Sequence, residues 1–135
     1  SLGVISGIKL SNSSIDILQA LLESVAYRFY FVYQLLKKHT NNAELFISGE
    51  AIKNSSWWIQ TISDVLNIPL RTLQQSEDTS RGTAILCLNS LGILKEIGSL
   101  ESNKCITIFP DEKKHKIHQE YLSNQTDLYK KNILN

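Results

Sequence analysis

The turn Ser48-Gly49-Glu50-Ala51 has residue types that can bring a backbone close to a bound ligand. It follows the apolar segment 44–48, which reads as a buried strand, and it leads into a helix. Glycine lets the backbone approach a ligand closely, and the first N–H groups of a helix are free to bind an anion. The pattern is compatible with a nucleotide-binding turn, although an ordinary strand-to-helix turn has the same local sequence.

No other group of residues has the spacing of a catalytic or metal site. His39, His115 and His118 share no spacing with cysteines or carboxylates that would bind a metal. Glu23 has no carboxylate three or four residues away, so we expect it to be buried and hydrogen-bonded. Asp64 is expected to make a local hydrogen bond within a helix. Because a Gly-x-Ser-x-Gly elbow is also missing, we predict no catalytic residue and no metal site in this chain.

A long amphipathic helix is the clearest element that the sequence predicts. Ser11–Ser14 provide an N-cap, and Asp16 lies in the first turn, where a carboxylate is favourable. A coiled coil is less favoured, because the apolar surface is broad and spans only three heptads. Apolar residues recur three and four positions apart, on one face that we expect to be buried: Ile15, Leu18, Leu22, Val25, Phe29, Val32 and Leu36.

Segments with strand and helix patterns alternate along the rest of the chain. Trp58 and Gln60 are expected to be structural, with Gln60 holding the turn that precedes its helix. A terminal helix begins at Pro110 and Asp111, and its apolar residues are Ile117, Tyr121 and Leu128. The predicted order is strand 3–10, the long helix, strand 44–48, helix 55–66, strand 69–73, loop 74–79, helix 79–91, polar link 95–104, apolar segment 106–109 and the terminal helix.

This alternation is typical of an α/β layer with parallel strands and flanking helices. Residues 1–94 would form a βαβαβα core, and residues 95–135 would form a linker and a helical tail. Three strands are few for such a sheet, and the chain contains no methionine. We therefore expect it to be one part of a larger domain.

Composition argues against several classes of partner. The 135 residues carry a net charge of +1, which gives no electrostatic case for nucleic acid or a membrane surface. No apolar run approaches the roughly 20 residues of a membrane span, and no signal peptide is recognisable. Cys87 and Cys105 form no CxxC pair, which fits a reduced, cytoplasmic protein.

Several segments resemble, in order and spacing, the sequence blocks of one enzyme family. They are Ala20–Tyr27, Ser48–Asn54, Trp58-x-Gln60, Asp64-Val65-Leu66 and Ser80–Ala84. The opening Gly7-Ile8-x-Leu10 and the terminal helix resemble further parts of the same family. Together these segments resemble the C-terminal part of the FGGY carbohydrate kinases, and the gluconate and xylulose kinases are the most similar branch.

The resemblance implies a partial actin-like ATPase domain, which is ribonuclease H-like, followed by a C-terminal helix. Such kinases transfer a phosphoryl group from ATP, bound with Mg²⁺, to a sugar hydroxyl. Their sugar site, catalytic aspartate and phosphate-binding loop belong to an N-terminal part, which this chain would need as a partner. By position, Gly49, Glu50 and Ala51 match the turn behind the nucleotide, Asn54 matches an adenine-binding position, and Gly82 lies on a helix that packs nearby.

The chain departs from the family pattern at four positions. Glu50 stands where the family has the second glycine of the turn, and Gln19, Ser24 and Ser63 replace arginine, glycine and alanine. A carboxylate beside a triphosphate repels it unless the carboxylate points outwards. The alternative function is therefore a degenerate, non-catalytic homologue that serves as a structural or interaction module. A partial sheet would also expose an edge through which the chain could form a homo-oligomer.

Overall fold

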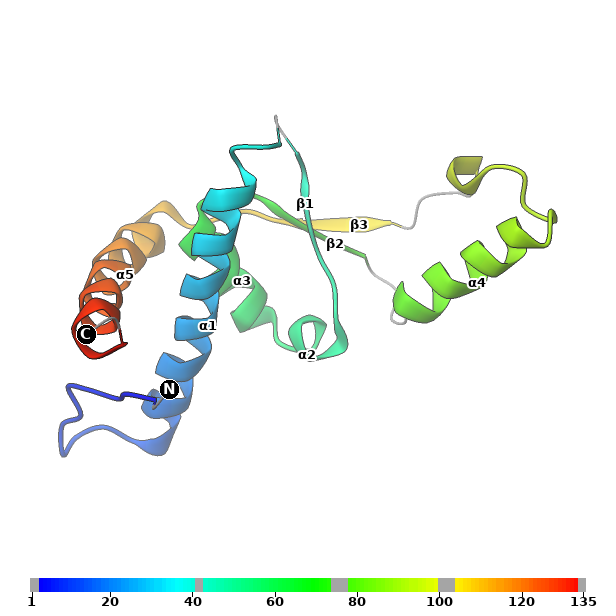
Figure 1. Ribbon diagram of the computed structural model, residues 1–135. Coiled ribbons are helices and arrows are strands. Elements are labelled where there is room, and N and C mark those ends of the chain that lie inside the picture. The colour runs from blue at the N-terminus through cyan, green and yellow to red at the C-terminus, as the bar shows by residue number, and fades with distance from the viewer. Residues whose placement is uncertain (1–2, 41–42, 74–77, 100–103, 134–135) are drawn as a thin grey trace.

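The computed structural model of the protein describes residues 3–40, 43–73, 78–99 and 104–133. A three-stranded sheet has the order β1-β2-β3, with strands Leu45–Ile47, Leu70–Leu73 and Cys105–Ile108. Helices α1 (Ser14–Leu36), α3 (Ser56–Leu66) and α5 (Glu112–Ile133) pack against one another beside it (Figure 1). This combination of a sheet and flanking helices confirms the predicted α/β class.

The strands differ from the sequence-based expectation in two respects. Segment 3–10 is not a strand, because residues 3–9 are exposed and pair with no strand of the described chain. The apolar segment near 106–109 instead forms β3, whose Ile108 pairs with Leu70 and whose Ile106 pairs with Thr72. β1 and β2 are parallel as expected, whereas β3 runs antiparallel to β2. The sheet is therefore mixed rather than parallel.

Helix α3 is the centre of the hydrophobic core. Its N-cap Ser55 accepts a hydrogen bond from the backbone N–H of Trp58, and Asn67 ends the helix in the left-handed conformation. Helices α1 and α5 both pack against α3, so all residues from 61 to 66 are buried. Each large apolar side chain contributes about 1.5–3 kcal/mol by burial, before the cost of ordering it. The core consists of Ala26, Tyr27, Ile59, Ile62, Val65, Leu66 and Leu70.

Helix α1 begins as the sequence predicts but buries a different face. Ser13 and Asp16 form a capping box, in which Asp16 Oδ2 accepts the Ser13 N–H at 2.7 Å and Ser13 Oγ accepts the Asp16 N–H at 3.2 Å. The buried residues of α1 are Ala26 and Tyr27. The expected apolar face is largely open because α3 and α5 cover only part of a wide apolar arc. Its exposed members are Ile15, Leu18, Val25, Phe29, Val32 and Leu36.

Helix α5 begins after Pro110 and Asp111, as predicted. Asp111 Oδ1 accepts the backbone N–H groups of Lys113 at 2.8 Å and Lys114 at 3.3 Å, which satisfies donors that the first turn leaves free. Leu122 is the α5 residue that packs against the core. The three apolar residues named from the sequence of this helix are exposed in the structure: Ile117, Tyr121 and Leu128.

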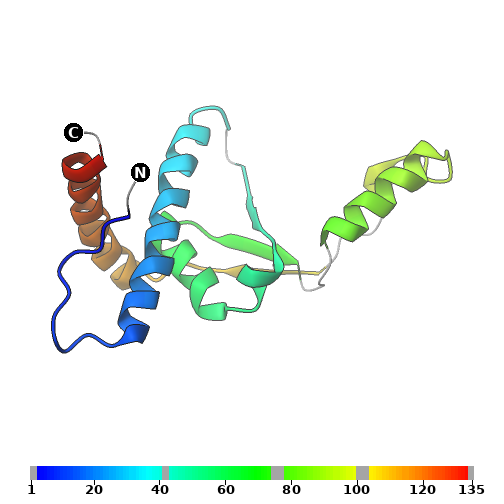
Figure 2. The same ribbon diagram turned by 60° about the horizontal axis from the view of Figure 1, so that its bottom comes forward.

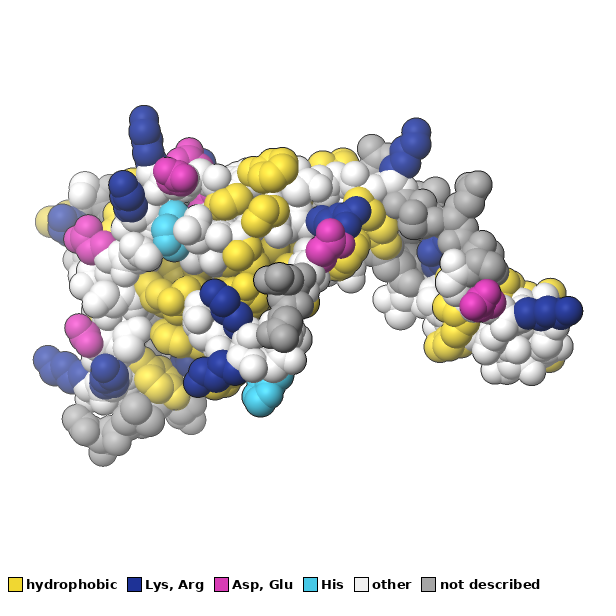
Figure 3. All heavy atoms as spheres, turned by 90° about the horizontal axis from the view of Figure 1, so that it is seen from above, with side chains coloured by type: hydrophobic (Ala, Val, Ile, Leu, Met, Phe, Trp, Pro, Cys, Tyr) yellow, Lys and Arg dark blue, Asp and Glu magenta, His cyan; other side chains and the backbone are white. Residues whose placement is uncertain are grey.

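Helix α4 (Asp78–Ser90) and the short 3-10 helix η1 (Ile97–Ser99) form an arm that projects from the end of the sheet (Figures 1 and 2). The predicted helix 79–91 is confirmed, and the predicted loop 74–79 lies mostly outside the described residues. Hydrophobic side chains are visible on the arm (Figure 3). The exposed apolar residues of this segment include Leu86, Leu88, Leu91 and Ile93. In the described part of the chain, no helix has both the length and the apolar character that crossing a bilayer requires.

Candidate functional site

The turn after β1 requires glycine at position 49. Gly49 has a φ of 114° and a ψ of 132°, a backbone conformation that residues with a side chain rarely adopt. A Cβ added at Gly49 would meet no other atom within 4 Å. The requirement for glycine therefore comes from the backbone, and the space beside Gly49 is open to a ligand.

The four-residue helix α2 (Glu50–Lys53), which the sequence did not reveal, fixes the turn in place. The Ile52 N–H donates to the Gly49 carbonyl at 3.1 Å, and the Asn54 N–H donates to the Glu50 carbonyl at 3.1 Å. The Ile52 side chain packs against the core. Ser55 then caps α3, so the turn is held between β1 on one side and the central helix on the other.

Glu50 and Asn54, two of the predicted site residues, contact each other. The Asn54 side-chain amide donates to Glu50 Oε1 at 3.2 Å, and both residues are exposed. The Glu50 carboxylate therefore lies along the side of α2 and reaches Asn54 at the C-terminal end of this helix. This bond occupies one of the two N–H donors of the Asn54 amide, which leaves a second donor and the amide oxygen for a ligand.

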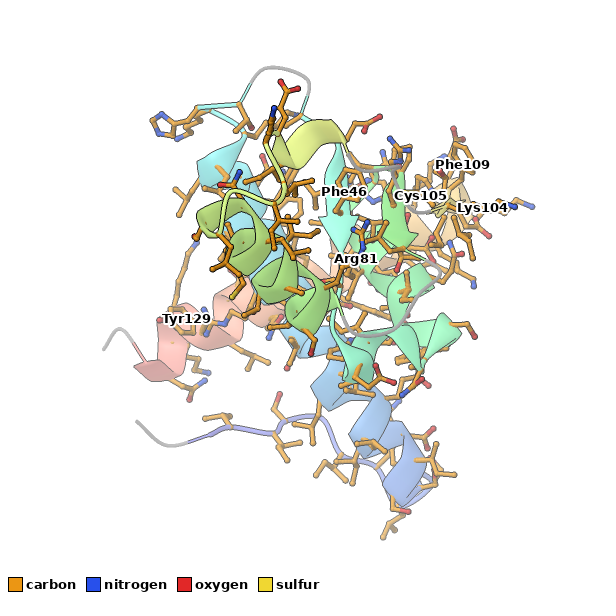
Figure 4. The ribbon with its side chains drawn as sticks, turned by 90° about the vertical axis from the view of Figure 1, so that its right-hand side faces the viewer. Phe46, Arg81, Lys104, Cys105, Phe109 and Tyr129 are labelled. Atoms are coloured by element: carbon orange, nitrogen blue, oxygen red, sulfur yellow. The ribbon has the colours of Figure 1, made fainter. Side chains whose placement is uncertain are left out.

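The structure gathers four of the five predicted site residues and leaves the fifth apart. Gly49, Glu50, Ala51 and Asn54 lie in one turn. Gly82 lies on α4, an element of the projecting arm that packs against η1. Figure 4, viewed from the side of the arm, shows the neighbouring Arg81 on α4 in front of the sheet. Within the described residues, no three His, Cys, Asp or Glu side chains come together as metal ligands would.

Asp64 is a buried carboxylate whose long-range role the sequence did not reveal. It is 1% exposed, and its Oδ1 accepts hydrogen bonds from Gln60 Nε2 at 2.8 Å and from the Asp111 N–H at 2.7 Å. Its carbonyl accepts a bond from His115 Nδ1 at 2.8 Å. The bond to Gln60 confirms the predicted local contact. The other two bonds attach the start of α5 to α3, and no local sequence pattern signals them.

Gln60 and Trp58 are structural residues, as predicted, but Gln60 holds a different turn. Its Nε2 donates to the carbonyl of Phe109 at 2.9 Å, so it fixes the link between β3 and α5 rather than the turn at Gly49. Trp58 Nε1 donates to the carbonyl of Leu22 at 3.3 Å, which joins α3 to α1. These bonds make α3 the common support of the turn, the sheet and both long helices.

A tyrosine–histidine contact joins α5 to α1. Tyr27 Oη lies 3.0 Å from His118 Nδ1, and the His118 ring lies edge-on to both Tyr27 and Tyr121. Burial raises the pKa of Tyr27 above its ordinary value, so the phenol keeps its proton at neutral pH. Tyr27 can therefore donate to a neutral His118, which accepts at Nδ1.

The pKa of His118 lies below its ordinary value, chiefly because burial disfavours the charged imidazolium. Charged groups nearby act in both directions. The carboxylates of Glu23 and Asp64 favour the charged form, whereas His115 and Lys114 disfavour it. The unfolded chain therefore takes up a proton at His118 at a higher pH than the folded chain does.

We predict that the free energy of unfolding falls as the pH drops from 7 through the ordinary histidine pKa of about 6.5 and below. A proton binds to His118 more readily in the unfolded chain, because burial lowers the pKa of His118 in the folded chain. Once protonated, His118 can no longer accept a hydrogen bond from the Tyr27 hydroxyl. Urea denaturation at a series of pH values measures the slope. His118→Gln should flatten it between pH 7 and 5, whereas His39→Gln, at an exposed position, should leave it unchanged. An unchanged slope in His118→Gln would contradict this assignment.

Comparisons with known proteins agree with this architecture. The sequence model of the FGGY family of carbohydrate kinases, C-terminal domain, matches residues 1–91. A xylulose kinase of Staphylococcus epidermidis is 28% identical over 95% of this chain and 26% of its own length. A glycerol kinase of Lactococcus lactis is 28% identical over 75% of this chain and 20% of its own length.

Solved structures give the same result for the fold. The xylulose kinase of Rhodospirillum rubrum superimposes with a TM-score of 0.74 at 23% identity, over 96% of this chain and 27% of that protein. The fold is therefore part of the actin-like ATPase fold of these kinases, as the sequence predicted. The chain spans only about a quarter of the length of the xylulose kinases that it matches. Since the family model covers well over half of its residues, this chain belongs to the FGGY family of carbohydrate kinases and corresponds to their C-terminal domain.

Proposed function

We propose that this chain forms the nucleotide-facing wall of an ATP-dependent carbohydrate kinase. The observation that carries the proposal is the Gly49 turn, which combines a positive φ with open space at the end of β1 in an FGGY chain. In this proposal Gly49, Glu50 and Ala51 lie behind the nucleotide, and Asn54 hydrogen-bonds the adenine. Gly82 belongs to a helix that approaches the nucleotide in the complete kinase.

The described residues fit a binding role rather than a catalytic one. Gly49 leaves room for a ligand against the backbone, and Asn54 keeps a free donor and acceptor on its amide. Bound ATP with Mg²⁺ would supply the transferable phosphoryl group and the charge neutralisation. Asp64, the buried carboxylate, accepts hydrogen bonds at Oδ1 from Gln60 and from the Asp111 N–H at the start of α5, which is a structural role. In this proposal, the general base for the sugar hydroxyl belongs to the rest of the kinase.

The extent of the sequence match favours a xylulose kinase-like branch within the family. The match with the S. epidermidis xylulose kinase covers 95% of this chain, whereas the match with the L. lactis glycerol kinase covers 75%. The family model ends at residue 91, before β3 and α5. We infer a sugar of the xylulose type as the substrate of the complete enzyme.

Nucleotide binding to the chain can be tested without catalysis. We expect ADP, titrated into the isotope-labelled chain, to shift the amide signals of Gly49, Ala51 and Asn54 more than those of α5. Such shifts would follow from contact of the ligand with this turn. We also expect the chain alone to transfer no phosphoryl group from ATP to xylulose, since the base and the sugar site lie outside it.

Two outcomes would contradict the proposal. One is the absence of any shift at the turn with ADP at millimolar concentration, with inorganic phosphate as the control for simple anion binding. The other is measurable xylulose phosphorylation by the purified chain, which would place catalytic groups within it. The first outcome would favour the degenerate homologue, for which Glu50 at the turn is the supporting observation.

Glu50 is expected to weaken nucleotide binding through its charge. Glu50→Gly should strengthen ADP binding by about tenfold, which corresponds to about 1.4 kcal/mol. Glu50→Gln removes the charge but keeps the side chain, and its amide oxygen can still accept from Asn54. Calorimetric titration of both variants separates the contribution of charge from that of bulk.

The pattern across these variants decides the cause. If charge dominates, Glu50→Gln and Glu50→Gly should bind ADP equally well. If bulk dominates, only Glu50→Gly should improve. Unchanged affinity in both variants would show that the carboxylate, held along α2 by Asn54, does not face the phosphates at all. Glu112→Gln, an exposed carboxylate at the start of α5, serves as the matched control.

A further inference from the structure

A hollow of about 270 Å³ lies among helices α1, α3 and α5, without a contribution from the turn at Gly49. Helix α5 lies beside α1 in both ribbon views (Figures 1 and 2), and the contact between Tyr27 and His118 joins the two helices. Pockets for drug-sized ligands measure about 300–1,000 Å³, so this three-helix hollow suits a smaller molecule. Polar and aromatic side chains of all three helices line it: Glu23, Trp57, Gln60, Asp64, His118 and Tyr121.

Hydrogen bonds hold the α3 side of the three-helix hollow in place. Gln60 Nε2 donates to Asp64 Oδ1 at 2.8 Å and to the carbonyl of Phe109 at 2.9 Å, which leaves the amide oxygen of Gln60 as an acceptor. Asp64 is 1% exposed and accepts its side-chain bonds at Oδ1, while its Oδ2 has no hydrogen-bond partner among the described residues. Buried carboxylate oxygens are normally bonded, so Oδ2 on the wall of a hollow is an acceptor available to a ligand.

The α5 side of the three-helix hollow contributes hydrogen-bond donors. His118 Nδ1 accepts the Tyr27 hydroxyl at 3.0 Å, so the proton of the neutral ring lies on Nε2. In the part of the chain that the structure describes, neither this Nε2–H nor the Tyr121 hydroxyl has a hydrogen-bond partner. The ammonium group of Lys114 also lines the hollow, and it likewise has no partner there. Free donors on α5 therefore accompany free acceptors on α3.

The charges around the three-helix hollow disfavour an anionic ligand. Glu23 accepts a bond from Gln19 Nε2 at Oε1 at 2.8 Å, which leaves its other oxygen as an acceptor. The carboxylates of Glu23 and Asp64 outnumber the single ammonium group of Lys114, so a phosphate group would meet net repulsion. A small cation would be repelled by Lys114 and would leave the His118 donor unpaired. Hydroxyl groups match this mixture, since each of them both donates and accepts.

Two aromatic side chains add apolar surface to the three-helix hollow. Trp57 and Tyr121 line it, and they are 40% and 47% exposed. The face of an aromatic ring is electron-rich, and the C–H groups of a sugar ring, which carry small positive charges, pack well against it. Aromatic surface beside mixed donors and acceptors is therefore complementary to a sugar, which presents both C–H groups and hydroxyl groups.

We propose that the three-helix hollow binds a neutral monosaccharide, as a sugar site outside the catalytic cleft of the proposed kinase. The sugar hydroxyls would donate to the free oxygens of Glu23, Gln60 and Asp64, and they would accept from His118 Nε2 and Lys114. The class of ligand follows from the hollow, whereas the choice of a pentose rests on the proposed function. Such a site would distinguish the substrate of the kinase from its product, because only the product carries a phosphate group.

Sugar titration of the chain tests this site, because the catalytic sugar site of the proposed kinase lies outside the chain. We expect xylulose to shift the indole N–H signal of Trp57 and the amide signal of Tyr121, with a dissociation constant in the millimolar range. Phosphorylated xylulose should bind at least about tenfold more weakly. Trp57→Leu and Glu23→Gln should each weaken xylulose binding by about tenfold. The matched controls Phe46→Leu and Glu120→Gln change an exposed aromatic residue and an exposed carboxylate outside the hollow, and they should not affect binding.

Four results would overturn the proposal. The first is the absence of shifts at Trp57 and Tyr121 with xylulose and with xylose, its ring-forming isomer, at about 0.1 M. The second is equal binding of xylulose and phosphorylated xylulose. The third is binding that Trp57→Leu and Glu23→Gln leave unchanged, which would place the sugar elsewhere. The fourth is larger shifts with ethylammonium than with either sugar, which would assign the hollow to a cation.

ADP titration separates this proposal from the proposed function, since the two ligands have separate reporters. Xylulose shifts at Trp57 without ADP shifts at Ala51 would support the sugar site and contradict the nucleotide turn. ADP shifts at Ala51 without xylulose shifts at Trp57 would support the nucleotide turn and contradict the sugar site.

Discussion

Replacing Asp64 by alanine is expected to lower the free energy of unfolding by about 3 kcal/mol. The carboxylate is 1% exposed and accepts hydrogen bonds from the Gln60 side chain and from the Asp111 N–H. Alanine would leave the Asp111 N–H, and one of the two N–H groups of the Gln60 amide, without an acceptor, and water would have to enter to satisfy them. Urea denaturation followed by tryptophan fluorescence measures the loss.

Two further variants make the Asp64 prediction specific. Asp64→Asn keeps an oxygen that can accept from Gln60 and Asp111, so we expect a loss of only about 1 kcal/mol. Asp127→Ala removes an exposed carboxylate from α5 and should change stability by less than about 0.5 kcal/mol. Equal stability of Asp64→Ala and the parent chain would show that Asp64 does not hold the start of α5.

The substitution Gly49→Ala is expected to destabilise the chain by about 1–3 kcal/mol. At a φ of 114° the new Cβ crowds its own backbone, although no other atom lies within 4 Å of it. The turn would have to shift to relieve this strain, and ADP-induced signals at Ala51 and Asn54 should weaken with it. Thermal unfolding and the nuclear magnetic resonance titration measure the two effects.

Gly82→Ala is the matched control for Gly49→Ala. An added Cβ at Gly82 likewise meets nothing within 4 Å, but Gly82 lies inside α4. Alanine is the better helix former there, so Gly82→Ala should be neutral or stabilising by about 0.5–1 kcal/mol. Opposite signs at the two glycines would attribute the cost at Gly49 to its backbone conformation. A neutral Gly49→Ala would show that the turn adapts freely.

Local sequence signals predicted the elements well, because caps and periodicity act within a few residues. Ser13 with Asp16, within the predicted cap, and Ser55, at the predicted start of helix 55–66, mark helix ends that the structure confirms. Strand pairing, by contrast, depends on a partner strand that lies far away in the sequence. Segment 3–10 has strand-like residues but finds no partner among the described strands, whereas Cys105–Ile108 finds β2.

Periodicity identified apolar faces without identifying what they pack against. Phe29 and Leu36 belong to the strongest apolar pattern in the sequence, yet they are exposed, since α3 and α5 cover a neighbouring part of the helix. Asp64 illustrates the same limit for polar groups, because its partner Asp111 is 47 residues away. The four-residue turn at Gly49 became a candidate site only through its resemblance to a family, since its local pattern is shared by ordinary turns.

The bonds between Asp64 and the start of α5 have a consequence for protein synthesis. A premature stop codon after Leu91 would preserve every residue that the family model matches. It would nevertheless remove Phe109, Asp111 and His115, all of which bond to Gln60 or Asp64 on α3. During translation, Gln60 and Asp64 on α3 likewise lack these hydrogen-bond partners until residues 109–115 leave the ribosome. We therefore expect α3 to reach its final packing only after residues 109–115 have been synthesised, and products that lack them to be degraded rather than retained.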